Sequence, residues 1–165
     1  MAEIAKAPGW NRPEVFLFAP WRGTGVTCDA FGIQRDKYEV SGSGRHDADG
    51  SVIIDYVVAF SGGLTNVHAL KIKPDTGEQI IAHDLISGED AKGRTTARGF
   101  YWATRAPLRT AFGTRVCRVE LVYEILGANE AISTVTAAFL GVTVATASAH
   151  LRRVDAAQQE QRKAS

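Results

Sequence analysis

The sequence predicts an all-β protein: an antiparallel up-and-down barrel of about eight to ten strands. Segments rich in Val, Ile, Thr, Tyr and Phe alternate apolar and polar residues over most of the chain. Clusters of Gly, Asp, Asn and Pro interrupt these segments about every 10 to 15 residues, the spacing of a strand and its turn. No central stretch keeps a helical period, so crossover helices and a parallel sheet are not expected.

The predicted turns divide the chain into its strands, in order. They lie at Gly42–Gly50, Ser61–Gly63, Pro74–Gly77, Gly88–Gly93 and Gly127–Asn129. The hairpin-length turns between them favour a meander, and a meander of this many strands can close on itself and so remove its exposed edges.

Two segments show the alternation most clearly. In Ser51–Phe60 one face carries Val52, Ile54, Tyr56, Val58 and Phe60. In Arg115–Leu126 one face carries Val119, Leu121, Tyr123 and Ile125, and the other carries Arg118, Glu120 and Glu124. A period of two turns the apolar set toward a core and the polar set toward water.

The length of 165 residues and mass of 17.8 kDa fit one domain with a substantial core. We expect a barrel over 13–154 between two short flexible tails, 1–12 and 155–165.

The last two strands bear on what fills the barrel. From Ala131 to Ala149 nearly all side chains are small, which would leave an interior cavity for a ligand or water. The alternative is that large residues of facing strands fill this space, namely Tyr56, Phe60, Trp102 and Tyr123.

A pattern of short motifs resembles an uncharacterised bacterial domain-of-unknown-function family with a lipocalin-like (calycin) β-barrel. It begins with WRGTGVTCDAFG at Trp21–Gly32. The matching positions, in order, are Arg22, Gly25, Asp29, Phe31, Gly32, Tyr38, Gly63, Ala82, Asp84, Gly88, Gly93, Trp102, Phe139 and Gly141. The resemblance covers about Pro13 to Arg153 and implies the same barrel fold.

The sequence also departs from that family. His68 and Leu70 stand where the family has an Arg-x-Trp pair, and Tyr56 stands where it has a glutamate. WRGTG and SAHLRRV are also similar to the first and last strands of nitrobindin-like barrels. Thr146 would occupy the position of their haem-ligating histidine, so haem is not expected.

His68 and Asp84 are the candidate catalytic residues. Alternation places His68 on the face of Leu70 and Ile72, and places Asp84 on the face of Ile80 and Ala82. Their strands are hairpin neighbours, so the two side chains can meet. A carboxylate beside an imidazole raises its basicity and suits general acid–base chemistry. A buried polar pair that only fixes the strand register is the alternative.

Other chemistry has no support in the sequence. Cys28 and Cys117 lie far apart and lack metal-ligand spacing, so we expect reduced thiols and no metal site. HDADG at His46–Gly50 lacks the spacing of a calcium loop. Nucleophile-elbow and phosphate-loop motifs are absent from the sequence, and no cofactor is expected.

Composition narrows the partners. A formal net charge of +1 gives no global field for nucleic acid or an anionic membrane, and no apolar run approaches the length of a membrane span. The first residues do not form a secretory signal, so a cytoplasmic location is expected. A homodimer is possible.

The sequence thus predicts a barrel that takes a small apolar or aromatic molecule. The expected walls are Tyr38, Tyr56, Phe60, Trp102 and Tyr123. With His68 and Asp84 it would be a cofactor-independent isomerase, cyclase or lyase. The alternatives are a non-catalytic carrier, or a packed barrel serving as an interaction or dimerisation module.

Overall fold

A computed structural model describes residues 8–110, 113–155 and 164. Of the expected tails, residues 1–7, 156–163 and 165 lie outside the described part. Its elements, in order, are α1 (Pro13–Phe16), β1 (Trp21–Asp29), β2 (Gln34–His46), β3 (Val52–Phe60), β4 (Thr65–Ile72), β5 (Gln79–Asp84), β6 (Asp90–Thr95), β7 (Gly99–Thr110), β8 (Gly113–Gly127), β9 (Glu130–Phe139) and β10 (Val142–Arg153).

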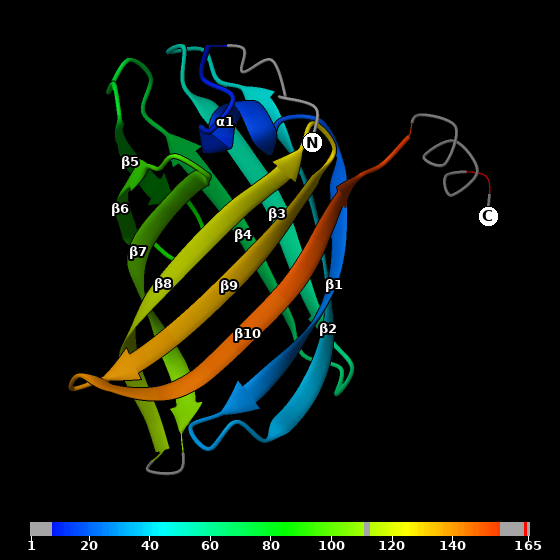
Figure 1. Cartoon of the computed structure of the whole chain (residues 1–165). Coiled ribbons are helices and arrows are strands. Elements are labelled where there is room, and N and C mark those ends of the chain that lie inside the picture. The colour runs from blue at the N-terminus through cyan, green and yellow to red at the C-terminus, as the bar shows by residue number, and fades with distance from the viewer. Residues whose placement is uncertain (1–7, 111–112, 156–163, 165) are drawn as a thin grey trace.

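The ten strands form one closed antiparallel barrel (Figure 1). Each strand pairs with its neighbours in chain order. β10 closes the ring on β1, from Trp21 opposite Arg153 to Asp29 opposite Ala145. The predicted all-β, up-and-down, lipocalin-like barrel is therefore confirmed, and closure leaves neither terminal strand as a free edge.

Alternation along the strands decides which side chains enter the barrel. In β3, Ile54 is buried in the core, whereas Asp55 forms an ion pair with Arg45, Nε to Oδ2 2.7 Å. In β8, Tyr123 lies in the core, whereas Glu124 is on the opposite side of the strand. The faces predicted for these two segments are confirmed.

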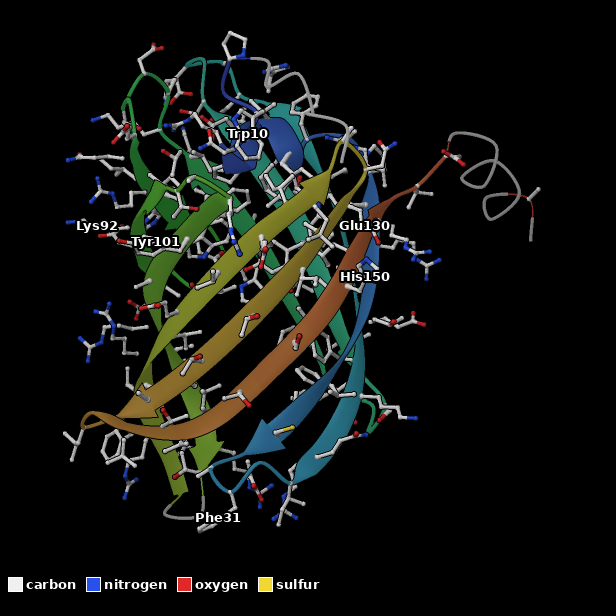
Figure 2. The ribbon with its side chains drawn as sticks, in the orientation of Figure 1. Trp10, Phe31, Lys92, Tyr101, Glu130 and His150 are labelled. Atoms are coloured by element: carbon white, nitrogen blue, oxygen red, sulfur yellow. The ribbon has the colours of Figure 1, made fainter. Side chains whose placement is uncertain are left out.

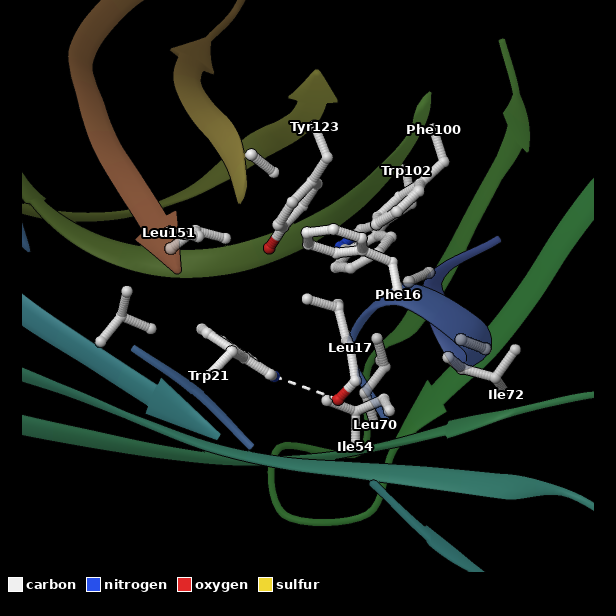
Figure 3. Packing of buried hydrophobic residues seen from close by; sticks show 14 of the residues in the cluster. Phe16, Leu17, Trp21, Ile54, Leu70, Ile72, Phe100, Trp102, Tyr123 and Leu151 are labelled. Atoms are coloured by element: carbon white, nitrogen blue, oxygen red, sulfur yellow. Dashed lines mark hydrogen bonds between the residues drawn. The ribbon is translucent and has the colours of Figure 1, made fainter. Parts of the chain in front are cut away.

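The helix α1 covers one end of the barrel, which we call the helix end (Figures 1 and 3). Phe16 and Leu17 pack into the core there, and the indole Nε1 of Trp21 donates to the carbonyl of Leu17 at 3.1 Å. The guanidinium of Arg153 lies 5.4 Å from the centre of the Phe16 ring. The sequence did not predict this helix.

Hydrogen bonds to the backbone of the barrel hold the segment around α1 in place. Asn11 donates from Nδ2 to the carbonyl of Thr96 at 2.7 Å, and the N–H of Gly44 donates to the carbonyl of Phe18 at 2.7 Å. A Cβ on Gly44 would lie 2.6 Å from the Phe18 ring. Glycine is therefore required for this close approach. The described end of the expected N-terminal tail is thus bonded to the barrel.

The strands β5 and β6 are short, and this shapes one side of the wall. Pairing of β4 with β5 runs only from Leu70 opposite Asp84 to Ile72 opposite Ala82. Pairing of β6 with β7 ends at Lys92 opposite Ala103. Among the described residues, no strand ladder joins residues 65–68 of β4 to residues 105–110 of β7. We call the end of the barrel opposite α1 the far end.

Both cysteines are free thiols: Cys28 is partly exposed and Cys117 is buried. In the part of the chain that the structure describes, no helix has the length and hydropathy needed to cross a bilayer.

Candidate functional site in the barrel interior

The interior is packed tightly at the helix end and less tightly toward the far end. At the helix end Phe100, Ile72 and Leu151 are fully buried. Farther along, the inward-facing Val58 and Phe60 of β3 are only partly buried. Strand pairing covers the backbone of β3 on both sides, and Phe60 also borders a concavity that crosses β1, β2 and β3. The core is thus filled near α1, and side chains toward the far end keep part of their surface accessible.

The small residues of β9 and β10 follow the same division. Near α1, Ala131 and Ala149 are buried in one cluster with Tyr123 and Leu151, whose larger side chains occupy the available space. Toward the far end, Ala147 is only partly buried. Near α1 large residues therefore fill the space beside the small ones, and a ligand cavity toward the far end stays a prediction.

Two concavities also lie along the wall. One of about 640 Å³ crosses β6, β7 and β8; it is bordered by Lys92 and Tyr101, which point outward in Figure 2, and by Arg105. The other, of about 600 Å³, crosses β1, β2 and β3, and its lining includes outward-facing Thr24 and Lys37 as well as Tyr38 and Phe60. The second concavity therefore includes two of the residues that the sequence predicted to line the ligand site.

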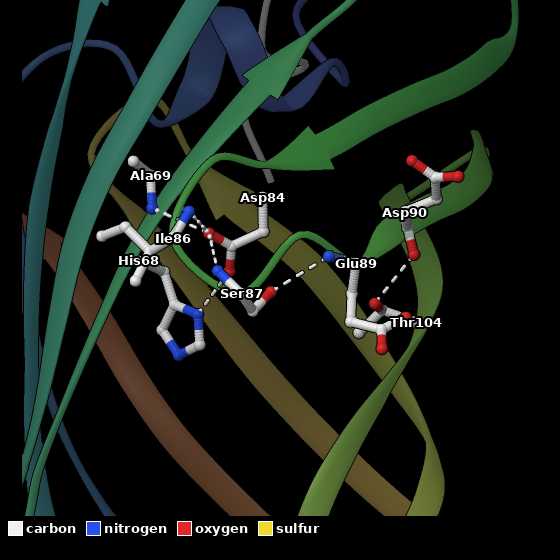
Figure 4. A network of polar contacts seen from close by, with 8 residues as sticks. All are labelled: His68, Ala69, Asp84, Ile86, Ser87, Glu89, Asp90 and Thr104. Carbon is white, nitrogen blue, oxygen red and sulfur yellow. Dashed lines mark hydrogen bonds and ion pairs between the residues drawn. The ribbon is translucent and has the colours of Figure 1, made fainter.

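The structure brings His68 and Asp84 together inside the barrel (Figure 4). Nδ1 of His68 lies 2.7 Å from Oδ2 of Asp84. The register explains the contact, because Asp84 stands opposite Leu70 and His68 lies two residues earlier on the same face of β4. Their side chains are 30% and 10% exposed, respectively. The catalytic role of the pair stays a prediction.

Asp84 is held as a carboxylate by its surroundings. Its Oδ1 accepts the N–H groups of Ile86 at 2.9 Å, Ala69 at 3.3 Å and Ser87 at 3.4 Å. Burial alone would raise the pKa of Asp84, but hydrogen bonds from His68, Ile86 and Ala69 outweigh burial and lower it below its ordinary value.

The charge on Asp84 determines the tautomer of His68. A carboxylate only accepts hydrogen bonds, so Nδ1 of the imidazole carries the hydrogen that is donated. In the neutral ring the nitrogen with the free lone pair is then Nε2. No described residue forms a hydrogen bond with that nitrogen, so it is available to a bound molecule.

His68 also lies flat against an aromatic neighbour. Its ring stacks on Tyr56, with centroids 4.6 Å apart and an angle of 20° between the planes. Tyr56 is the direct cross-strand partner of His68. The imidazole is thus fixed on one side by Tyr56 and at one nitrogen by Asp84.

Three tyrosine hydroxyls of the interior have raised pKa values, a feature that the sequence analysis missed. Burial raises the pKa of Tyr38 to about 12. Burial also raises the pKa of Tyr56, with a contribution from the charge of Asp84, and raises that of Tyr123, with contributions from Tyr56 and Tyr38.

These hydroxyls are not consumed by the protein's own hydrogen bonds. None of Tyr38, Tyr56 and Tyr123 forms one with a described residue. Within the described chain, the only fully enclosed side-chain N or O atom without a partner is Oε2 of Glu14. The tyrosine hydroxyls therefore retain access to solvent inside the barrel and can donate to a polar atom of a ligand.

The predicted wall residues fall into two groups. Tyr38 and Phe60 contact each other across β2 and β3, with ring centroids 5.8 Å apart, and Tyr56 lies beside His68. Trp102 and Tyr123 instead pack against Phe100 at the helix end. Trp102 is 2% exposed, so a ligand would reach it only after neighbouring side chains moved.

The remaining histidines lie elsewhere. His83 pairs with Asp90, Nδ1 to Oδ1 2.8 Å, but these side chains are 48% and 72% exposed on the outside. His150 contacts Glu130 on the outer wall (Figure 2). The described residues contain no group of three or more His, Cys, Asp or Glu side chains suited to hold a metal ion.

Comparison with known proteins shows relatives of the fold. No family model and no curated protein matches the chain. A protein of unknown function from the DUF3598 family of Nostoc punctiforme superposes with a TM-score of 0.56 and 18% identity. The match covers 91% of this chain but 53% of that protein, so the chain spans about half its length.

The S-type phycobiliprotein lyase CPES from Guillardia theta superposes with a TM-score of 0.59 and 6% identity, over 86% of this chain and 90% of the lyase. At such identities the likeness concerns the fold alone. Both structures agree with the predicted lipocalin-like barrel.

Proposed function

We propose that the protein binds a small apolar or aromatic molecule inside the barrel and that His68 and Asp84 transfer a proton on it. The observation that carries this proposal is the environment of one atom. Among the described residues, none forms a hydrogen bond with Nε2 of His68, and the other ring nitrogen lies 2.7 Å from Asp84. The partly buried side chains beside this ring supply an apolar lining.

The residues have distinct parts in the proposed reaction. Nε2 of His68 removes a proton from the bound molecule, and the charge of Asp84 stabilises the imidazolium that forms. The hydroxyls of Tyr56, Tyr38 and Tyr123 can donate hydrogen bonds to an oxygen on which negative charge develops. Return of the proton at another atom completes an isomerisation or cyclisation, and loss of a leaving group completes an elimination. These steps require positioning and a base, and no cofactor.

The fold comparison supports this reading as an analogy. One structural neighbour is named a phycobiliprotein lyase, so the barrel shape occurs in a protein named for catalysis. The proposal for this chain rests on its own interior residues.

A non-catalytic carrier is the alternative that one observation favours. Asp84 also accepts N–H groups of Ile86, Ser87 and Ala69, so it holds the β5–β6 turn whether or not His68 moves protons. A carrier would have the same lumen and the same hydrogen-bonded pair.

Native mass spectrometry of freshly purified protein tests ligand binding. We expect a fraction with the added mass of a co-purifying small molecule, and the exact mass would identify its chemical class. The aromatic probe anilinonaphthalene sulfonate should bind in competition with it. If the protein binds neither, the ligand-binding proposal fails.

Deprotonation of 5-nitrobenzisoxazole, a small aromatic probe, tests proton transfer. A base removes the ring C–H proton, the N–O bond breaks, and a coloured cyanophenolate forms. We expect His68→Ala to lower the protein-dependent rate by about 10²-fold. Asp84→Asn should also lower it, because the amide cannot stabilise the imidazolium.

The exposed pair of His83 and Asp90 provides matched controls for this assay. His83→Ala and Asp90→Asn remove the same residue types from the outer wall, and both should retain the wild-type rate. A rate that is equal in wild type, His68→Ala and His83→Ala would contradict proton transfer by His68. Probe binding with no rate would favour the carrier.

A further inference from the structure

The hairpin connections at the two ends of the barrel differ in chemistry. At the helix end they are polar: residues 47–51, 73–78, 96–98 and 128–129 contain no large apolar side chain. At the far end, residues 30–33, 61–64, 85–89 and 140–141 each contain at least one. Turns are normally polar, so the apolar residues of the far end need a separate explanation.

These far-end side chains are exposed to solvent. We call Phe31, Ile33, Leu64, Leu140 and Val142 the apolar rim. Phe31 is 88% exposed and Leu140 is 86% exposed, and Figure 2 shows Phe31 at this extremity of the barrel. The hairpins that carry these residues lie around the same end of the barrel (Figure 1).

Leu140 is unusual in backbone conformation as well as in exposure. It forms with Gly141 the two-residue connection between Phe139 and Val142. Both connecting residues have positive φ, 50° for Leu140 and 80° for Gly141. Asn-Gly is the favoured sequence for such a turn, and leucine is strained there. The turn geometry therefore does not account for leucine at this tip.

The adjoining β7–β8 hairpin is positively charged. From Thr104 to Val119 the sequence contains arginine at positions 105, 109, 115 and 118 and no acidic residue. All four arginines are exposed. Among the described residues, no carboxylate pairs with Arg105, Arg109 or Arg115, and Arg118 lies 3.7 Å from Glu120. The net charge of +1 for the whole chain conceals this local excess.

We propose that the apolar rim docks the far end of the barrel on an anionic lipid bilayer. Phe31, Leu140 and the other rim side chains insert among the acyl chains, and the arginines of β7–β8 contact the phosphate and carboxylate headgroups. Docking at a surface needs no membrane-spanning segment. This proposal differs from the expectation, drawn from the net charge, that the protein has no membrane partner. The inference does not depend on the proposed proton transfer.

Charge favours a bilayer over a second copy of the chain. A symmetric dimer through the rim would bring the same arginine-rich hairpins toward each other, and like charges at an interface oppose association. An anionic bilayer supplies the opposite charge across its whole surface.

Co-sedimentation with lipid vesicles tests the proposal. The probes are phosphatidylcholine vesicles without and with about 30% phosphatidylserine. Wild-type protein should bind the phosphatidylserine vesicles more tightly, and added salt should weaken this preference. The double variant Phe31→Ser/Leu140→Asn should bind these vesicles at least about tenfold more weakly than the wild type. Arg105→Gln/Arg109→Gln should reduce the preference for phosphatidylserine.

Two controls separate docking from damage to the fold. Leu126→Ser removes an exposed leucine near the helix end and should leave vesicle binding unchanged. Leu140→Asn alone should raise the melting temperature, because asparagine tolerates the positive φ, while it weakens binding.

Three outcomes would overturn the proposal. They are no binding of the wild type to either vesicle, unchanged binding by the double variant, or a dimer in sedimentation velocity that the double variant abolishes. The last outcome would assign the rim to a second copy instead.

Discussion

At the residue scale, the described part of the chain contains two histidine–aspartate pairs with almost the same distance between their atoms. The Nδ1–oxygen distances are 2.7 Å in His68–Asp84 and 2.8 Å in His83–Asp90. Their surroundings differ, because the first pair faces the interior and the second faces water. Electrostatic interactions are stronger where water is scarce, so only the interior pair has an environment suited to acid–base work.

The interior tyrosines predict a loss of stability at alkaline pH. Tyr38 has a pKa of about 12, and burial raises the pKa of Tyr56 and Tyr123 as well, whereas a phenol in the unfolded chain ionises near pH 10. Unfolding therefore releases protons above about pH 10, and the free energy of unfolding should fall as the pH rises from there toward 12.

Tyrosinate absorbance, recorded during an alkaline titration, measures this effect. The chain has four tyrosines, and in the folded protein three of them should ionise late or together with unfolding. Tyr38→Phe should leave a smaller fall in stability between about pH 10 and 12. Four tyrosines titrating near pH 10 in the folded protein would contradict the enclosed positions of these rings.

At the scale of elements, α1 acts as part of the core despite its length of four residues. Leu17 is fully buried, so Leu17→Ala should lower the free energy of unfolding by about 2 to 5 kcal/mol. Val15 lies within α1, whereas Leu17 directly follows it; Val15 is exposed, so Val15→Ala should change the free energy of unfolding by about 0.5 kcal/mol or less. Urea denaturation of both variants measures the difference. Equal small effects would show that α1 does not support the fold.

The strands were predictable and α1 was not, for a physical reason. Alternating apolar residues must share one face of a strand, so β3 and β8 could be recognised with their inner and outer sides. A helix of four residues is too short to display a helical period, and Pro13 at its start reads equally well as a loop residue.

The candidate site was predictable where it depends on one hairpin. His68 and Asp84 lie on adjacent strands, so alternation and the short turn between those strands were enough to bring them together. The tyrosine hydroxyls come from β2, β3 and β8, and β8 approaches the other two only when the ring closes. Burial of Trp102 likewise depends on α1, which the sequence did not reveal.

At the scale of the whole molecule, the wall is uneven in its hydrogen bonding. β8 pairs with β7 and with β9 along nearly its whole length, whereas β4 and β5 share only the register from Leu70 to Ile72. Strands with few ladder bonds open most easily.

Hydrogen–deuterium exchange should therefore distinguish the two sides of the barrel. We expect amides of β5, β6 and residues 65–68 to exchange faster than amides in the middle of β8 and β9. Peptide-level mass spectrometry at several labelling times measures the rates. Equal protection around the whole ring would contradict the weak side of the wall.

The packing of Phe16 and Leu17 at the helix end has a consequence for the rates of ligand binding and release. If the proposed ligand reaches the interior only from the far end, because Phe16 and Leu17 fill the helix end, it binds and leaves past the same hairpins. Microscopic reversibility then links the two rate constants. A residue that only narrows the opening slows association and dissociation by equal factors. Such a residue lengthens the residence time of the ligand and leaves its equilibrium affinity unchanged.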